Sequence, residues 1–173
     1  MKTSRMQLFA LPGMPMVQPG ADLVDMISQG LVRADETLKA GALLVLAQKI
    51  VSKAANRIVD LRDVMPTAEA EALAGEVDKD PRQVQLILDE SVDVVGKRPG
   101  VLIVAHRIGI VMANAGIDAS NVEQDDGTEH VLLLPEDPDA DSRALRQTML
   151  ERHGVEISVI INDSVGRAWR QGT

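Results

Sequence analysis

A turn of small residues carries a carboxylate that could bind a metal ion. The segment MANAGIDASNV at 112–122 begins as an apolar strand and continues as a turn rich in alanine and glycine. Small residues let a ligand approach the backbone closely. Asp118 would supply a hard oxygen ligand for a divalent cation, and Asn121 a neutral hydrogen-bonding partner. An Asx-type turn at a strand end explains the same residues, and spacing alone leaves both interpretations open.

A second carboxylate stands at the end of a predicted strand, in IINDSVGRAWRQGT at 160–173. Asp163 lies beside the Ser164 hydroxyl, and such a pair can hold a metal ion. Arg167 and Arg170 follow in the same turn and could each bind phosphate or carboxylate oxygens through two hydrogen bonds. The alternative is a surface turn with a lone tryptophan packed against the body. The density of polar groups favours a site.

A third segment, AQKIVSKAANR at 47–57, concentrates positive charge after a predicted buried strand. Lys49, Lys53 and Arg57 are gathered here in a chain whose net charge is −8, which suggests an anion site. A solvated basic edge that protects a sheet margin is the common alternative.

Carboxylates and cations at strand ends fit a metal–nucleotide site, because Mg²⁺ or Mn²⁺ binds through few carboxylates together with substrate phosphates. The sequence contains neither a Walker-type phosphate loop nor a G-x-G-x-x-G dinucleotide fingerprint. The residues therefore indicate phosphoryl or acyl-phosphate chemistry on an unidentified substrate.

Composition excludes other sites and partners. The 18 Lys and Arg against 26 Asp and Glu would repel a nucleic acid. A single Phe, a single Trp and no Tyr leave no platform on which bases could stack. The absence of Cys excludes disulfides, zinc–thiolate centres and thiol nucleophiles. The apolar runs are far shorter than the roughly 20 residues of a membrane span, so we expect a cytoplasmic protein without a membrane partner.

The predicted elements show no clean strand–helix–strand repeat. Apolar runs and alternation predict strands at 6–11, 42–47, 101–105, 108–113, 131–134 and 155–162. Helical spacing and capping signals predict helices at 22–34, within 67–91 with a start at Asp80–Pro81, and at 139–153. The stretch 50–61 is typical of strand and turn. Together these predict one α+β domain over 1–173, with mixed or antiparallel sheets and flanking helices.

Five collinear segments cover most of the chain: GMPMVQPG at 13–20, GALLVLAQKIVSKAANR at 41–57, HRIGIVMANAGIDASNV at 106–122, LLLPEDPDADSRALR at 132–146 and VIINDSVGRAWRQGT at 159–173. Together they resemble the coenzyme F-420-0:L-glutamate ligase family, also called F-420 gamma-glutamyl ligase. Within them the stretches AGIDASNV and NDSVGRAWR are specific to this resemblance, and the segment at 13–20 is weaker.

The resemblance implies a GTP-dependent ligase that attaches L-glutamate to coenzyme F-420-0, first by an amide and then by gamma-glutamyl bonds. A substrate carboxylate would attack the γ-phosphate of GTP, and the amine of glutamate would capture the resulting acyl phosphate. The expected ions are Mg²⁺ or Mn²⁺, with K⁺ in addition. The implied fold is the gamma-glutamyl-ligase type, an intertwined homodimer with its active site near the subunit interface.

By position, the resemblance also assigns site residues. Metal ligands fall on Asp118, Asp163 and Ser164. Nucleotide contacts fall on Met14, Pro15, Met16, Val17, Gln48, Lys53 and Asn121. Lys49, Arg167 and Arg170 are further candidates for binding phosphate or substrate.

The sequence departs from the family pattern at a few positions. Ser164 stands where Thr is frequent and keeps the hydroxyl, while Gln48 replaces a common Ser. The sequence ends at Thr173, whereas family members usually continue with a segment that adds nucleotide and metal contacts. Two alternatives therefore stand beside the ligase: a truncated, non-catalytic protein that binds nucleotide or coenzyme, and an amide ligase for another carboxylate.

Overall fold

The computed structural model describes residues 6–119 and 129–164 and shows a mixed α+β architecture, as predicted. The helices are α1 (Leu23–Arg33), α2 (Gln48–Ala54), α3 (Ala68–Val77), α4 (Pro81–Asp89) and α5 (Pro138–His153), with 3₁₀ turns at Leu61–Asp63 and Asn114–Gly116. The strands are β1 (Leu43–Ala47), β2 (Ile58–Asp60), β3 (Ser91–Arg98), β4 (Val101–His106), β5 (Val111–Ala113), β6 (His130–Leu132) and β7 (Ser158–Asn162). No helix in these ranges is long and apolar enough to cross a membrane.

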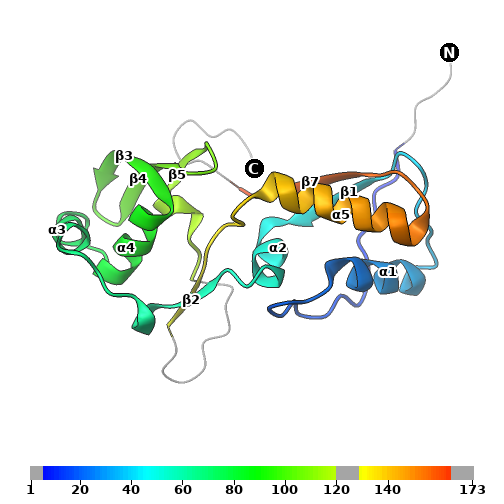
Figure 1. Cartoon of the computed structure of the whole chain (residues 1–173), viewed down its shortest axis with the longest axis horizontal. Coiled ribbons are helices and arrows are strands. Elements are labelled where there is room, and N and C mark those ends of the chain that lie inside the picture. Colours follow the sequence, from blue (N-terminus) through cyan, green and yellow to red (C-terminus); the bar gives the residue numbers. More distant parts are fainter. Residues whose placement is uncertain (1–5, 120–128, 165–173) are drawn as a thin grey trace, which may run out of the picture.

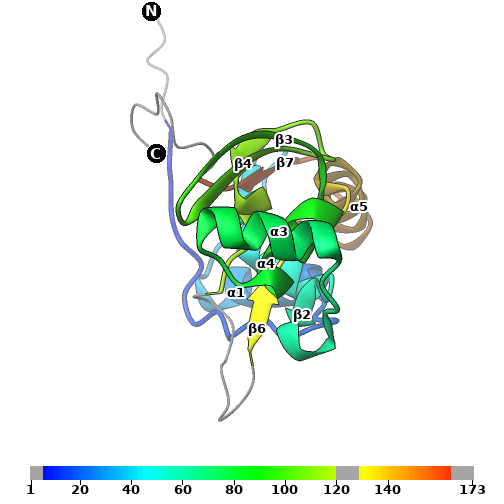
Figure 2. The same ribbon diagram turned by 90° about the vertical axis from the view of Figure 1, so that its left-hand side faces the viewer.

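The elements form two groups along the long axis, with β2 and β6 paired between them (Figure 1). One group holds the antiparallel sheet β3-β4-β5, and α3 and α4 pack on one face of it (Figure 2). Helix α4 begins where the sequence predicts, because the Asp80 side chain accepts from the Arg82 backbone N–H and Pro81 follows at the first turn.

The other group contains the parallel pair β1–β7, packed against α1, α2 and α5. Alternate residues of the strands, such as Leu46 and Ile161, face this core. The opposite face exposes Leu43, Val45 and Ile160. Since the strands run parallel and Ala47 pairs with Asn162, the chain leaves both strands at the same edge of the sheet.

A partly buried ionic network joins the two groups. The Arg57 guanidinium donates to the Leu134 carbonyl at 2.9 Å and to the carboxylates of Glu90 and Glu136, both at 2.8 Å. The Glu90 side chain is only 8% exposed, and its Oε2 lies 3.5 Å from Nε2 of the His106 ring. His106 therefore has the structural role that is usual for a strand histidine.

Two expectations about secondary structure are wrong, and one strand was not predicted. Residues 6–11 form no strand, because alternation alone gives no pairing partner, and Met6 and Leu8 are exposed. The start of the 50–61 stretch belongs to α2, whose buried face is set by Gln48, Val51 and Ser52 at helical spacing. Strand β3 was not predicted, because its alternation is broken by two register irregularities.

Candidate functional site

The shared edge of β1 and β7 places two predicted site residues together. Gln48 begins α2 and Asp163 follows β7, and both line a small cavity of about 210 Å³ with Leu134 and Pro135. Gln48 is buried and donates from Nε2 to Ser52 Oγ at 2.5 Å, which fixes its side chain. Asp163 is exposed, and its Oδ1 accepts from the Ser164 backbone N–H at 2.8 Å.

Asp118 lies in the other group of elements and does not line this cavity, but it contacts the neighbouring residue of α2. Its carboxylate forms an ion pair with the ammonium of Lys49, the residue directly after Gln48. Its backbone pairs with Leu132 through two hydrogen bonds of 2.8 and 3.0 Å, and Leu132 is only 1% exposed. The first turn of α2 therefore contacts Asp118 through Lys49 and shares a cavity with Asp163 through Gln48.

These donors fit a divalent cation. Asp118, Asp163 and the Ser164 hydroxyl are hard oxygen donors, which Mg²⁺ and Mn²⁺ prefer. In the structure the Asp118 carboxylate pairs with the ammonium of Lys49. Within residues 6–119 and 129–164 no three His, Asp or Glu side chains form a metal-binding group. A donor set this small suits an ion that also takes oxygens from substrate phosphates.

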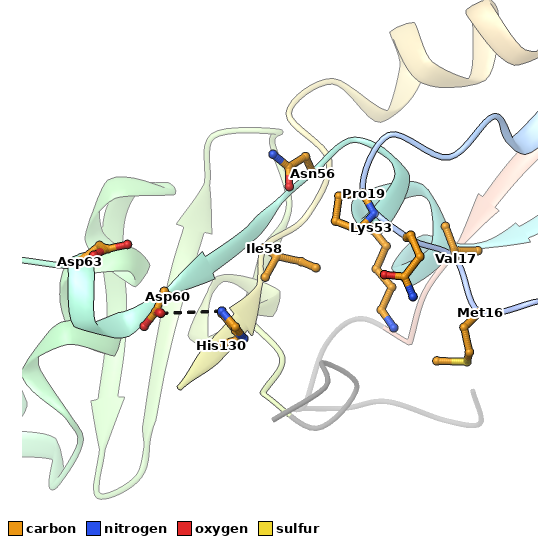
Figure 3. Close-up of a pocket in the computed structure, with 10 residues that line it drawn as sticks. Met16, Val17, Pro19, Lys53, Asn56, Ile58, Asp60, Asp63 and His130 are labelled. Carbon is orange, nitrogen blue, oxygen red and sulfur yellow. Dashed lines mark ion pairs between the residues drawn. The ribbon is translucent and has the colours of Figure 1, made fainter. Parts of the chain in front are cut away.

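A larger cavity of about 450 Å³ lies beside α2 (Figure 3). Three of the predicted nucleotide residues, Met16, Val17 and Lys53, line it, and the Lys53 side chain projects between Ile58 and Met16. Its remaining lining residues are Gln18, Pro19, Asn56, Ile58, Asp60, Asp63 and His130. A cavity of this size has room for a base and ribose, and its lining of one lysine and two carboxylates has no excess of positive charge.

The wall opposite Lys53 is acidic. The Arg62 side chain and backbone N–H lower the pKa of Asp60 to about 2, so this carboxylate stays ionised at neutral pH. His130 Nε2 lies 3.7 Å from Asp60 Oδ2. Sequence reasoning missed both residues. The pairing of Asp60 with His130 across β2 and β6 brings them together, and no local pattern signals that pairing.

The other predicted residues separate into three cases. Met14 lies outside the larger cavity and packs against α1, with its Sδ 3.9 Å from an Arg33 nitrogen, and Pro15 is exposed beside it. Gln48 lies in the smaller cavity, at the edge rather than beside Lys53. The last three fall outside the described residues: Asn121, Arg167 and Arg170.

Comparisons with known proteins identify the family of the chain. Residues 13–173 match the family model described as F420-0:Gamma-glutamyl ligase. A protein of Methanothermobacter thermautotrophicus named coenzyme F420:L-glutamate ligase is 39% identical over 165 residues, covering 95% of this chain and 64% of that protein.

Two further relatives carry the same name. The Methanopyrus kandleri protein is 39% identical, over 90% of this chain and 58% of its own length. The Archaeoglobus fulgidus protein is 38% identical, over 97% of this chain and 64% of its own length. The chain thus spans less than two thirds of the length of these relatives. Because the family match extends over nearly the whole chain, the protein belongs to the F420-0:gamma-glutamyl ligase family.

Proposed function

We propose that this chain carries the metal- and nucleotide-binding part of a GTP-dependent ligase that adds L-glutamate to coenzyme F-420-0. The observation that carries the proposal is the common edge of β1 and β7, where α2 contacts Asp118 and shares a cavity with Asp163. Membership of the family and the names of the relatives support the substrates.

The two lysines of helix α2 suggest how the nucleotide would be oriented in the site. Lys49 and Lys53 are four residues apart, so they lie on the same side of the helix, one turn from each other. The base and ribose would occupy the larger cavity beside Lys53, and the phosphates would extend toward Lys49 and the carboxylates. Lysine ammonium groups suit this role because each offers three rotatable donors to phosphate oxygens.

The reaction would proceed in two displacements. An oxygen of the coenzyme carboxylate attacks the γ-phosphorus of GTP, and GDP leaves with the electrons of the broken P–O bond. The amine of glutamate then attacks the acyl carbon, phosphate leaves, and the amide nitrogen loses its proton to solvent. Lys49 and Lys53 would offset negative charge on the phosphates. A divalent ion held by Asp118, Asp163 and Ser164 would stabilise the same developing charge.

The test is to incubate the protein with GTP, MnCl₂, L-glutamate and coenzyme F-420-0, and to follow glutamate additions by mass spectrometry. One added glutamate with equimolar GDP supports amide ligation, and further additions support gamma-glutamyl extension. GTP binding by calorimetry without GDP or product would instead favour a non-catalytic binding protein. Product with another carboxylate but none with coenzyme F-420-0 would favour a different amide ligase.

A homodimer, an additional K⁺ ion and the choice between Mg²⁺ and Mn²⁺ are part of the same proposal. Light scattering measures the molecular mass in solution and so tests the homodimer. Omitting K⁺ from the glutamate-addition assay tests whether that ion is needed. Exchanging Mn²⁺ for Mg²⁺ in the same assay tests which divalent ion the reaction prefers.

A further inference from the structure

We propose that Lys49 neutralises Asp118 in the nucleotide-free protein and moves to the nucleotide phosphates when a divalent cation takes its place on Asp118. The inference rests on the proposed function, because it requires a metal–nucleotide site at this edge. The inference gives Lys49 a role of its own, which is to couple the binding of the divalent cation to the binding of the nucleotide.

The two partners of the ion pair differ in mobility. The backbone of Asp118 is held by two hydrogen bonds to the buried residue Leu132, and the Asp118 side chain is 21% exposed. Lys49 reaches it from the first turn of α2 on a flexible four-carbon stem, and its side chain is 39% exposed. When the pair separates, the lysine can therefore move while the carboxylate keeps its position.

Electrostatic repulsion is the reason why Lys49 would leave Asp118 when a divalent cation binds. A divalent cation on Asp118 would meet the Lys49 ammonium at contact distance, and two cations repel when they share one carboxylate. The Asp163 carboxylate, which shares a cavity with the residue before Lys49, would further favour the divalent ion. The Lys49 ammonium thus occupies the position beside the Asp118 carboxylate. A divalent ion binds there more favourably once Lys49 has another anionic partner.

The phosphates supply that partner. Lys53 lines the larger cavity one helical turn away, so a triphosphate that extends from this cavity along α2 approaches Lys49. Nucleotide binding would draw Lys49 from Asp118 and remove the competing ammonium from the carboxylate. By linkage, each ligand would then strengthen the binding of the other.

The test measures Mn²⁺ affinity by electron paramagnetic resonance, without nucleotide and with GTP. Lys49→Gln should bind Mn²⁺ alone about twofold to fivefold more tightly than the wild type, the range that an ion pair of this exposure allows. GTP should raise Mn²⁺ affinity less in Lys49→Gln than in the wild type. Lys49→Arg keeps the charge and should remain close to the wild type.

Two controls make the outcome decisive. Lys39→Gln removes the same charge from an exposed position outside both cavities, so its affinity for Mn²⁺ alone should not change. Lys49→Met preserves the packing of the stem and should reproduce Lys49→Gln if either variant folds poorly.

Unchanged or weaker binding of Mn²⁺ alone by both Lys49→Gln and Lys49→Met would overturn the inference. Asp118→Asn separates this failure from that of the proposed function. If Asp118→Asn loses Mn²⁺ while the Lys49 variants show no gain, only the role of Lys49 is wrong. If Asp118→Asn binds Mn²⁺ like the wild type, the metal site itself is wrong.

Discussion

Ala47 of β1 lies opposite Asn162 of β7 in a parallel pair, so the next residue of each strand enters the same cavity. Gln48 and Asp163 become neighbours in this way although they are far apart in the sequence. The pairing also starts α2 at the sheet edge, which brings Lys49 to Asp118. The arrangement of the candidate site thus follows from the register of two short strands.

Asp163→Asn should weaken Mn²⁺ binding about tenfold or more, because an amide is a poorer ligand for a hard cation than a carboxylate. Asp163 is exposed, so the free energy of unfolding should change by less than about 0.5 kcal/mol. Calorimetry with MnCl₂ and urea denaturation measure the two quantities. Asp139→Asn, an exposed carboxylate on α5, is the matched control, and equal Mn²⁺ binding by both variants would show that Asp163 holds no metal.

Lys53→Met should weaken GTP binding roughly tenfold, the loss expected for one charge-assisted hydrogen bond to phosphate. Fluorescence titration with a labelled GTP analogue measures this effect. Lys39→Met removes the same charge from an exposed position outside the cavity and should leave affinity unchanged. A similar loss in both variants would mean that only overall charge matters.

Glu90→Gln should lower the free energy of unfolding by about 2 kcal/mol, because it removes the buried charge that pairs with Arg57 and Arg107, while Glu136 still pairs with Arg57. Urea denaturation at neutral pH measures the change. Glu76→Gln breaks the exposed pair with Lys97 and should cost less than about 1 kcal/mol. Equal effects of the two substitutions would contradict a stabilising role for the network.

The same carboxylate predicts a pH dependence. Burial alone would raise the pKa of Glu90, but the His106 ring and the Arg57 guanidinium outweigh burial and lower it to about 2 from a usual 4.5. A lowered pKa means that Glu90 stabilises the fold above pH of about 4.5 and loses this contribution as the pH falls toward 2. Between these values the wild type should lose more stability than Glu90→Gln. Parallel curves for the two proteins would exclude this contribution.

Val45→Glu should weaken the proposed homodimer. Parallel sheets are normally covered on both faces, yet β1 and β7 expose Leu43, Val45 and Ile160 at 55%, 51% and 46%. Sedimentation measures the dimer dissociation constant, which should rise at least tenfold. Val32→Glu, at an 80% exposed position of α1, is the control, and an unchanged dimer in Val45→Glu would place the interface elsewhere.

Local signals predicted the elements whose ends are marked chemically. Helix α5 has Asp137 as its N-cap and ends at Gly154 in the left-handed conformation, as the sequence indicates. Strand β1 was found from an apolar run that follows a glycine. Helix α2 was missed because only seven residues carry its helical spacing, and Ile50 and Val51 favour strands.

The site itself was only partly predictable. Charge and the positions of turns at strand ends predicted Asp118, Asp163, Lys49 and Lys53 as candidates. Their mutual placement could not be predicted, because the ion pair of Lys49 with Asp118 and the pairing of β1 with β7 are tertiary contacts. The acidic wall of the larger cavity was missed for the same reason.

The central claim is that Asp118 and Asp163 hold one cation that the phosphates of GTP share. Anomalous diffraction at the manganese edge, from crystals grown with MnCl₂ and a non-hydrolysable GTP analogue, tests it most directly. We predict a manganese peak within bonding distance of both carboxylates and of a phosphate oxygen. A peak bound to one carboxylate alone, or a nucleotide whose phosphates lie away from this edge, would contradict the claim.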